Sequence, residues 1–186
     1  MNTRFQNLLV RTCISLTVVP LLSLFNACTS YQLGSPAEIS FQSIYIKPVA
    51  NYSFAPQAQA VISAQLRERF IHDARVIVVA EEEKADAVLF VDLTEYNRSA
   101  GARNSNDTAI ANDFDIRLKA NISLLDQANG DYLFKDRSIE ARTSAYIGNP
   151  YAANQIISYQ QSERQAMTRL AREISRKISD EVLSPW

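Results

Sequence analysis

The sequence places one thiol where lipid attachment is expected. Residues Leu22–Cys28 read Leu-Ser-Leu-Phe-Asn-Ala-Cys, an apolar run that ends in a small residue followed by a cysteine. Arg4 and Arg11 are the only charged side chains before Cys28, so basic, apolar and small segments follow one another as in a secretory signal. We interpret the stretch as a bacterial lipobox. Cleavage before Cys28 removes residues 1–27 and leaves a thiol that accepts acyl chains such as palmitate.

Two observations favour lipidation over an ordinary cleavable signal that happens to carry a cysteine. Cys28 stands where the apolar core Ile14–Phe25 stops, and that core is itself too short for a spanning helix, which needs about 20 apolar residues. No cysteine follows Cys28, and an unpaired cysteine in an exported protein is a reactive liability. The ordinary signal remains the alternative.

Seven basic side chains near the predicted sheet edges and loops offer a second kind of chemistry. Arginine and lysine bind phosphate through charge-assisted hydrogen bonds, so a cluster of them predicts a site for a phosphorylated lipid headgroup. The alternative is a solvated sheet face. The candidate ligand-binding residues are Arg98, Arg103, Arg117, Lys119, Lys135, Arg137 and Arg142.

No set of residues predicts catalysis, a metal site or a cofactor. His72 is the only histidine and lies among polar residues at the end of a predicted helix, which favours a structural or exposed role. The run Glu81–Glu83 is better explained as a solvated turn than as a cation site. An enzyme would need a nucleophile with an oriented base, and the sequence offers none.

Composition predicts one exported domain. Removal of residues 1–27 from the 186 leaves 159, a normal length for a single core. The loss of Arg4 and Arg11 lowers the basic residues from 19 to 17 against 20 acidic ones, which gives a charge near −3. No global field therefore attracts nucleic acid. Residues 28–36 form a short tether that keeps the domain, residues 37–186, close to the membrane.

Hydrophobic periodicity predicts the elements of the first half. Alternation over Ile39–Val49 predicts a strand, and Ala58, Ile62, Leu66 and Phe70 recur every fourth residue, as in an amphipathic helix. Two further strands are expected. The first, Arg75–Ala80, is apolar on both faces and is expected to be central, and the second is Val88–Tyr96. A polar loop is expected after them, over Asn97–Asn112.

The second half predicts a hairpin and a long helix. Apolar and polar residues alternate from Phe114 to Leu124, and Asn129-Gly130 is a strong turn signal before a strand over Tyr132–Thr143. If the loop between the two strands has an even number of residues, the inner face carries Leu133, Ile139 and Ala141 together with Leu118 and Leu124. The outer face then carries Arg117, Lys119, Glu140 and Arg142. This register does not allow Leu124 to pair with Phe134. A helix from about Ala152 to Leu183 presents an apolar stripe to the sheet.

These elements predict an α+β fold. We expect a single two-layer domain in which a mixed or antiparallel sheet of four to five strands packs against two helices.

Three motifs and the order of elements resemble a known family. Tyr31-Gln32-Leu33 follows Cys28 closely, the strand and turn run from Ile44 to Ser53, and Ala85-Asp86-Ala87-Val88-Leu89 enters the next strand. The order of strand, helix, strands with a long loop, hairpin and terminal helix extends the similarity over the mature chain. On these residues the chain resembles the LptE family of outer-membrane lipopolysaccharide-assembly lipoproteins.

The resemblance implies a binding role without catalysis or a cofactor. Members of that family plug the lumen of the LptD β-barrel, support its assembly and contact lipopolysaccharide on its way to the outer leaflet. It implies a lipid-anchored protein on the periplasmic face of the Gram-negative outer membrane, and Thr29 is not the aspartate that retains many lipoproteins at the inner membrane. The alternative is another envelope lipoprotein adaptor, such as a peptidoglycan-synthase activator or a secretion-channel subunit.

Overall fold

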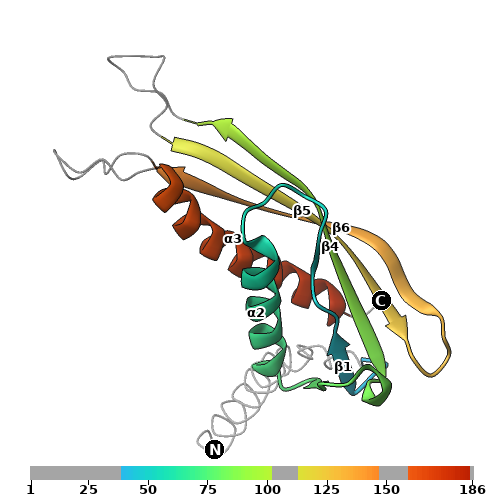
Figure 1. Ribbon diagram of the computed structural model, residues 1–186. Helices are drawn as coiled ribbons and strands as arrows, with labels where there is room; N and C mark the ends of the chain where they lie inside the picture. The colour runs from blue at the N-terminus through green and yellow to red at the C-terminus, as the bar shows by residue number, and fades with distance from the viewer. Residues whose placement is uncertain (1–38, 102–112, 147–158, 185–186) are drawn as a thin grey trace, which may run out of the picture. The chain divides into compact units, whose positions relative to one another are not determined.

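Six strands form one mixed sheet, and two helices pack against one of its faces (Figure 1). The computed structural model describes residues 39–101, 113–146 and 159–184. The strands run in the order β3-β1-β4-β5-β6, with β2 also beside β4. The strands are β1 (Ser43–Ile46), β2 (Ala50–Asn51), β3 (Ile77–Val78), β4 (Ala87–Ala100), β5 (Asp113–Asp126) and β6 (Tyr132–Tyr146).

The predicted α+β single domain is confirmed, with a sixth strand of two residues, β2. Strands β1, β2 and β3 are parallel to their neighbours, whereas β4, β5 and β6 form an antiparallel meander. The helices are α2 (Ala58–Ile71) and α3 (Tyr159–Val182), with a 3-10 turn, η2 (Glu82–Lys84), before β4. The predicted helical start near Ala152 lies outside the described residues. No described helix combines the length and the apolar character that a membrane crossing requires.

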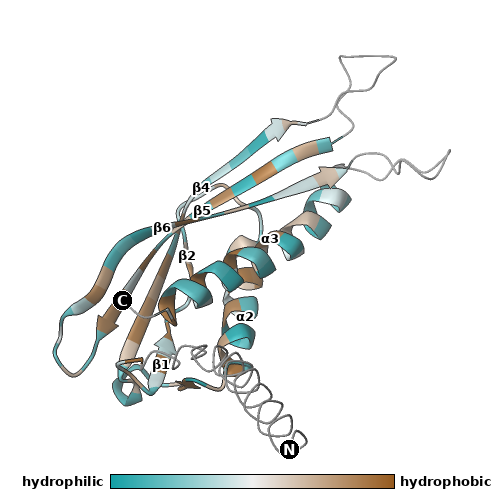
Figure 2. Ribbon diagram, turned by 180° about the vertical axis from the view of Figure 1, so that it is seen from behind, coloured by the Kyte–Doolittle hydropathy of each residue, from teal (hydrophilic) through white to brown (hydrophobic). Residues whose placement is uncertain are grey.

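The core lies between the sheet and the two helices. Leu118, Ile122 and Leu124 on β5 are fully buried, and apolar and polar residues alternate along the strands (Figure 2). Helix α2 buries Ile62, Leu66 and Phe70, the residues that its periodicity predicts. The buried stripe of α3 consists of Ala166, Met167, Leu170, Ala171, Ile174, Ile178 and Val182. The apolar stripe predicted from the sequence is therefore the surface that builds the second layer.

Strand β4 continues through four residues that the sequence predicted to be loop. Asn97 pairs with Arg117 and Ala100 pairs with Phe114, so Asn97–Ala100 belongs to β4. The prediction failed there because it was based on polar composition. Asn97 and Ser99 lie on the sheet face that neither α2 nor α3 covers, where polar side chains are stable and the β5 ladder holds the backbone extended. The rest of the predicted loop, 102–112, lies outside the described residues.

The prediction of a central strand at Arg75–Ala80 was wrong, because β3 lies at an edge of the sheet. Among the described strands it pairs with β1 alone, and Ile77 is 69% exposed. An apolar run is buried on both faces only where other layers cover both faces of the sheet, and it is central only where strands pair with it on both sides.

The predicted hairpin register holds in the middle of the strands and changes near the turn. Lys119 lies opposite Glu140, as expected, but Leu124 pairs with Phe134, the pairing that simple alternation excluded. The register shifts between Ile122 and Leu124, where Asp136 has a φ of 54°. The bulge inserts an extra residue into β6, which turns Phe134 into the core and leaves Leu133 half-buried.

Helix α3 also blocks the outer edge of the sheet. Lys177 Nζ donates a hydrogen bond to the Glu140 carbonyl at 2.7 Å, and Arg169 donates one to the Ser144 carbonyl at 2.6 Å. Ser162 donates to the carbonyl of Tyr146. These carbonyls alternate along β6 on the side away from β5, so helix side chains occupy the acceptors that another strand would use.

The bulge predicts a specific response to substitution at Asp136. A residue with φ near 54° costs little for glycine but about 1–2 kcal/mol for a β-branched residue. We expect Asp136→Gly to unfold at the same or a higher urea concentration than the wild type, and Asp136→Val to lose about 1–2 kcal/mol of unfolding free energy. Equal stability of the two variants in urea titrations would contradict this backbone conformation.

Candidate functional site

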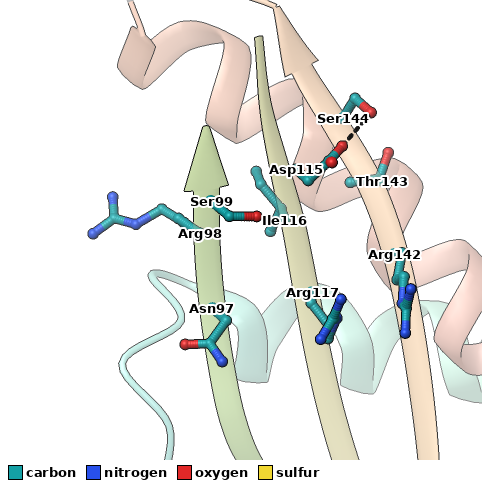
Figure 3. A pocket seen from close by; sticks show the side chains of 9 residues that line it. All are labelled: Asn97, Arg98, Ser99, Asp115, Ile116, Arg117, Arg142, Thr143 and Ser144. Carbon is teal, nitrogen blue, oxygen red and sulfur yellow. Dashed lines mark hydrogen bonds between the residues drawn. The ribbon is translucent and has the colours of Figure 1, made fainter. Parts of the chain in front are cut away.

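The outer face of the β4-β5-β6 meander carries a trough of about 400 Å³ near the C-terminal end of β4 (Figure 3). It lies on the face opposite the helices, which stand behind the sheet in this view. Nine residues of three adjacent strands line it, and those whose side chains belong to the outer face are polar. They are Asn97 and Ser99 from β4, Asp115 and Arg117 from β5, and Arg142 and Ser144 from β6.

Strand register brings two arginines together in this trough. Arg117 on β5 lies directly opposite Arg142 on β6, and both contact Glu140. The distance from Arg117 Nε to Glu140 Oε1 is 3.3 Å, and Arg142 Nε donates a hydrogen bond to the same oxygen. One carboxylate therefore holds two guanidinium groups side by side.

The third cation of this face is Lys119, which lies two residues after Arg117 on β5. Its Nζ lies 3.0 Å from Glu95 Oε2, across the β4–β5 pair. At the other end of the trough, Ser144 donates a hydrogen bond of 3.0 Å to Asp115 Oδ1. Three cations thus share the face with the carboxylates of Glu95, Asp115 and Glu140, and an anion must compete with these carboxylates.

The arginines also act on the ionisation of Glu140. The hydrogen bond from Arg142 holds the pKa of the Glu140 carboxyl below its ordinary value of 4.5, and the charges of Arg142, Arg117 and Lys119 lower it further. Glu140 is therefore ionised throughout the physiological pH range, and the two guanidinium groups are held in place before any ligand arrives.

Six of the seven candidate basic residues lie in the described part of the chain, and they do not form a single cluster. Arg117, Lys119 and Arg142 gather on the outer face, as the pairing predicted. Lys135 lies nearer the hairpin turn, with its Nζ 5.3 Å from the centre of the Tyr132 ring.

Two other candidate residues lie on the helix-covered face and contact α3. Arg98 is 3.4 Å from Glu163, and Arg137 forms an ion pair with Glu181. Alternation explains this position, because Arg98 pairs with the buried Ile116 and Arg137 pairs with the buried Ile122. Arg103 and Cys28 lie outside the described residues.

Sequence reasoning missed the polar residues that complete the trough. Asn97 and Ser99 were assigned to a loop, and Asp115 and Ser144 were not considered as ligand contacts. Asp115 could have been found from the sequence, because the alternation of β5 places it on the same face as Arg117. Asn97 and Ser99 required knowledge that β4 extends to Ala100.

The other residues that the sequence singled out lie outside the trough. His72 is exposed at the C-terminal end of α2, and Glu82 and Glu83 lie in η2. In residues 39–101, 113–146 and 159–184, no three His, Cys, Asp or Glu side chains are grouped so that they would hold a metal ion.

Comparisons with known proteins give a family and a fold. A family model described as LptE, lipopolysaccharide-assembly, matches residues 41–182. A hypothetical protein from Chlamydia trachomatis superposes with a TM-score of 0.53 at 11% identity, covering 76% of this chain and 96% of that one. A minor lipoprotein from Acinetobacter baumannii superposes with a TM-score of 0.50 at 13% identity, covering 78% and 92%. No sequence among the curated proteins matches.

The contacts of Glu140 predict how its titration depends on its neighbours. We expect Arg142→Gln to raise the carboxyl pKa toward 4.5, and Arg117→Gln to raise it less, because only Arg142 lowers it through a hydrogen bond. Since the folded pKa is depressed, the stabilisation is present above pH 4.5 and is lost as the pH falls through the folded value. Carbon-13 NMR of the carboxyl carbon measures this. An unchanged pKa in Arg142→Gln would contradict it.

Proposed function

The chain belongs to the LptE family of lipopolysaccharide-assembly proteins, and we propose that it is an outer-membrane lipoprotein that plugs an LptD-type β-barrel and binds lipopolysaccharide. In this proposal it supports assembly of the barrel and contacts lipopolysaccharide during insertion into the outer leaflet, without catalysing a reaction. The family match over residues 41–182 carries the proposal, because it spans nearly all of the described domain.

The outer-face trough supports the ligand part of the proposal. Lipopolysaccharide carries phosphate groups, and paired guanidinium groups bind phosphate through several charge-assisted hydrogen bonds. Arg117 and Arg142 are adjacent and oriented by Glu140, so a phosphate that displaces Glu140 finds both donors in place. Asn97, Ser99 and Ser144 add neutral hydrogen-bonding groups suited to sugar hydroxyls.

The anchor in this proposal is a lipid on Cys28 after cleavage of residues 1–27. The first strand, β1, begins at Ser43, so a short segment joins the lipid to the sheet. An acyl chain contributes roughly 0.8 kcal/mol per buried methylene, and stable anchoring requires more than one chain. The anchor then holds the binding domain close to a partner in the same membrane.

Charge reversal in the trough tests the ligand. We expect Arg117→Glu combined with Lys119→Glu to weaken binding of purified lipopolysaccharide by about tenfold or more, because each lost charge-assisted bond is worth roughly 1.5–3 kcal/mol. Glu140→Gln should strengthen binding, since it removes the competing carboxylate. Microscale thermophoresis compares the variants. Arg172→Glu, an exposed arginine on α3, is the matched control and should bind as the wild type does. Unchanged binding in the double variant would remove this face from the proposal.

Purification from membranes tests the partner and the anchor together. Wild-type protein at near-native expression should fractionate with the outer membrane and co-purify with a large β-barrel, identified by mass spectrometry. Cys28→Ala should lose the membrane association, because no acyl chain is attached. Recovery of a peptidoglycan synthase or a secretion channel in place of a barrel would favour the adaptor alternative. Membrane association of Cys28→Ala equal to that of the wild type would contradict the anchor.

A further inference from the structure

The contact between α2 and α3 leaves a groove at the surface of the helix layer. It consists of two hollows that follow one another along the helices, one of about 640 Å³ beside the first turn of α2 and one of about 490 Å³ beside its last turns. The lining side chains recur every three or four residues, so each helix contributes one stripe. The stripes are Val61, Gln65, Glu68 and His72 on and just after α2, and Arg164, Thr168, Arg172 and Arg176 on α3. We call this surface the helix groove.

Two arginines of the helix groove have no carboxylate beside them. The side chains of Arg164 and Arg172 are exposed, and in the part of the chain that the structure describes neither guanidinium group takes part in an ion pair. Arg69 and Arg176 differ, because Asp180 lies 3.7 Å from the first and 2.8 Å from the second. Arg164 and Arg172 are therefore the arginines whose charge is available to an external anion.

The carboxylates nearest to these two arginines do not neutralise the groove. Glu163 is buried and accepts a hydrogen bond of 2.6 Å from the Tyr96 hydroxyl, with Arg98 at 3.4 Å, so its charge is directed to the sheet. Glu68 lines the second hollow and accepts a hydrogen bond of 2.9 Å from the neutral amide of Gln65. The two unpaired arginines thus face one uncompensated carboxylate, and the groove keeps a positive excess.

The spacing of the arginines indicates an elongated ligand. Arg164 and Arg172 are eight residues apart, which is about 12 Å along α3. In the trough, by contrast, Arg117 and Arg142 share one carboxylate. A single phosphate group reaches only one of two arginines so far apart. In an extended peptide, residues four apart are separated by about 13 Å and direct their side chains to the same side, so two carboxylates at this spacing reach both.

The surface between the arginines suits a peptide. Met167 and Val61 line the first hollow and offer an apolar contact midway along the groove. Gln57, Gln160 and Thr168 line the same hollow. Their amide and hydroxyl groups both donate and accept hydrogen bonds, as the backbone of an extended segment requires.

We propose that the helix groove binds an extended acidic segment of a partner protein. Two carboxylate side chains four residues apart contact Arg164 and Arg172, and an apolar side chain midway between them lies against Met167. Charge complementarity selects this segment, because each carboxylate finds a guanidinium group that no internal partner occupies. The site lies on the helix layer and the trough lies on the opposite face of the sheet, so this inference goes beyond the proposed function and either site can fail without the other.

A synthetic peptide tests the proposal directly. The probe is the acetylated and amidated peptide Gly-Glu-Ser-Leu-Ser-Glu-Gly, titrated to millimolar concentration into the full mature chain in detergent. Chemical-shift changes of the Thr168 and Arg172 amides, followed by NMR, give the dissociation constant. The same residues in the order Gly-Ser-Glu-Glu-Ser-Leu-Gly keep the charge but lose the spacing. This second peptide should bind about tenfold or more weakly, because it leaves one arginine unpaired.

Matched variants separate the groove from a general charge effect. Arg164→Glu and Arg172→Glu should each weaken binding of the probe about tenfold or more, because each replaces a contact with repulsion. Glu68→Gln should strengthen it, since it removes the carboxylate that repels the probe. Arg67→Glu makes the same charge reversal at an exposed position of α2 that lines neither hollow, and it should leave binding unchanged.

Binding of lipopolysaccharide separates this site from the trough. Arg172→Glu should bind purified lipopolysaccharide as the wild type does while it loses the probe. Three results would overturn the proposal: no binding of the probe, equal binding of the two peptides, or equal loss of the probe in Arg67→Glu and Arg172→Glu. A loss of lipopolysaccharide binding in Arg172→Glu would also overturn it, because the groove would then be assigned to lipid phosphate.

Discussion

The pairing register of β5 is the constraint on which the other features depend. Because side chains alternate, this one strand supplies Leu118, Ile122 and Leu124 to the core and Arg117 and Lys119 to the opposite face. A slip of one residue would exchange the two sets and would place charges under the helices. The register is fixed because such a slip would expose apolar side chains to water. The fixed register in turn aligns the arginines of β5 and β6. The geometry of the trough is thus a consequence of core formation.

Helix α3 contacts both the helix-covered face of the sheet and its β6 edge. Its apolar stripe closes the core, while its polar residues contact charged side chains and backbone carbonyls of the sheet. Glu163 and Glu181 contact Arg98 and Arg137, and Lys177 reaches the β6 edge. The side chains of Arg98 and Arg137 are 50% and 40% exposed, and ion pairs of such exposure contribute little to stability. Their contacts with α3 therefore help to orient the helix on the sheet.

The trough is arranged by internal ion pairs. Exposed ion pairs contribute little to stability, and their effect here is to orient the side chains. Glu140 holds Arg117 and Arg142 together and also occupies the position that an external anion would take. Such an arrangement favours ligands that offer several acceptor oxygens at once, since a single weak acceptor gains nothing by displacing a carboxylate. It also makes binding sensitive to ionic strength.

The sequence by itself determined the class of fold, the presence of both helices and of every strand except β2, and the outward position of Arg117, Lys119 and Arg142. These follow from local periodicity, which depends only on the alternation of residues along the chain. Tertiary structure decided the rest. The bulge at Asp136, the extension of β4 through Asn97–Ala100 and the edge position of β3 depend on which strand lies beside which. An apolar run such as Val76–Val79 has the same pattern in the centre of a sheet and at its edge. Only the neighbouring strands determine whether its backbone groups are paired.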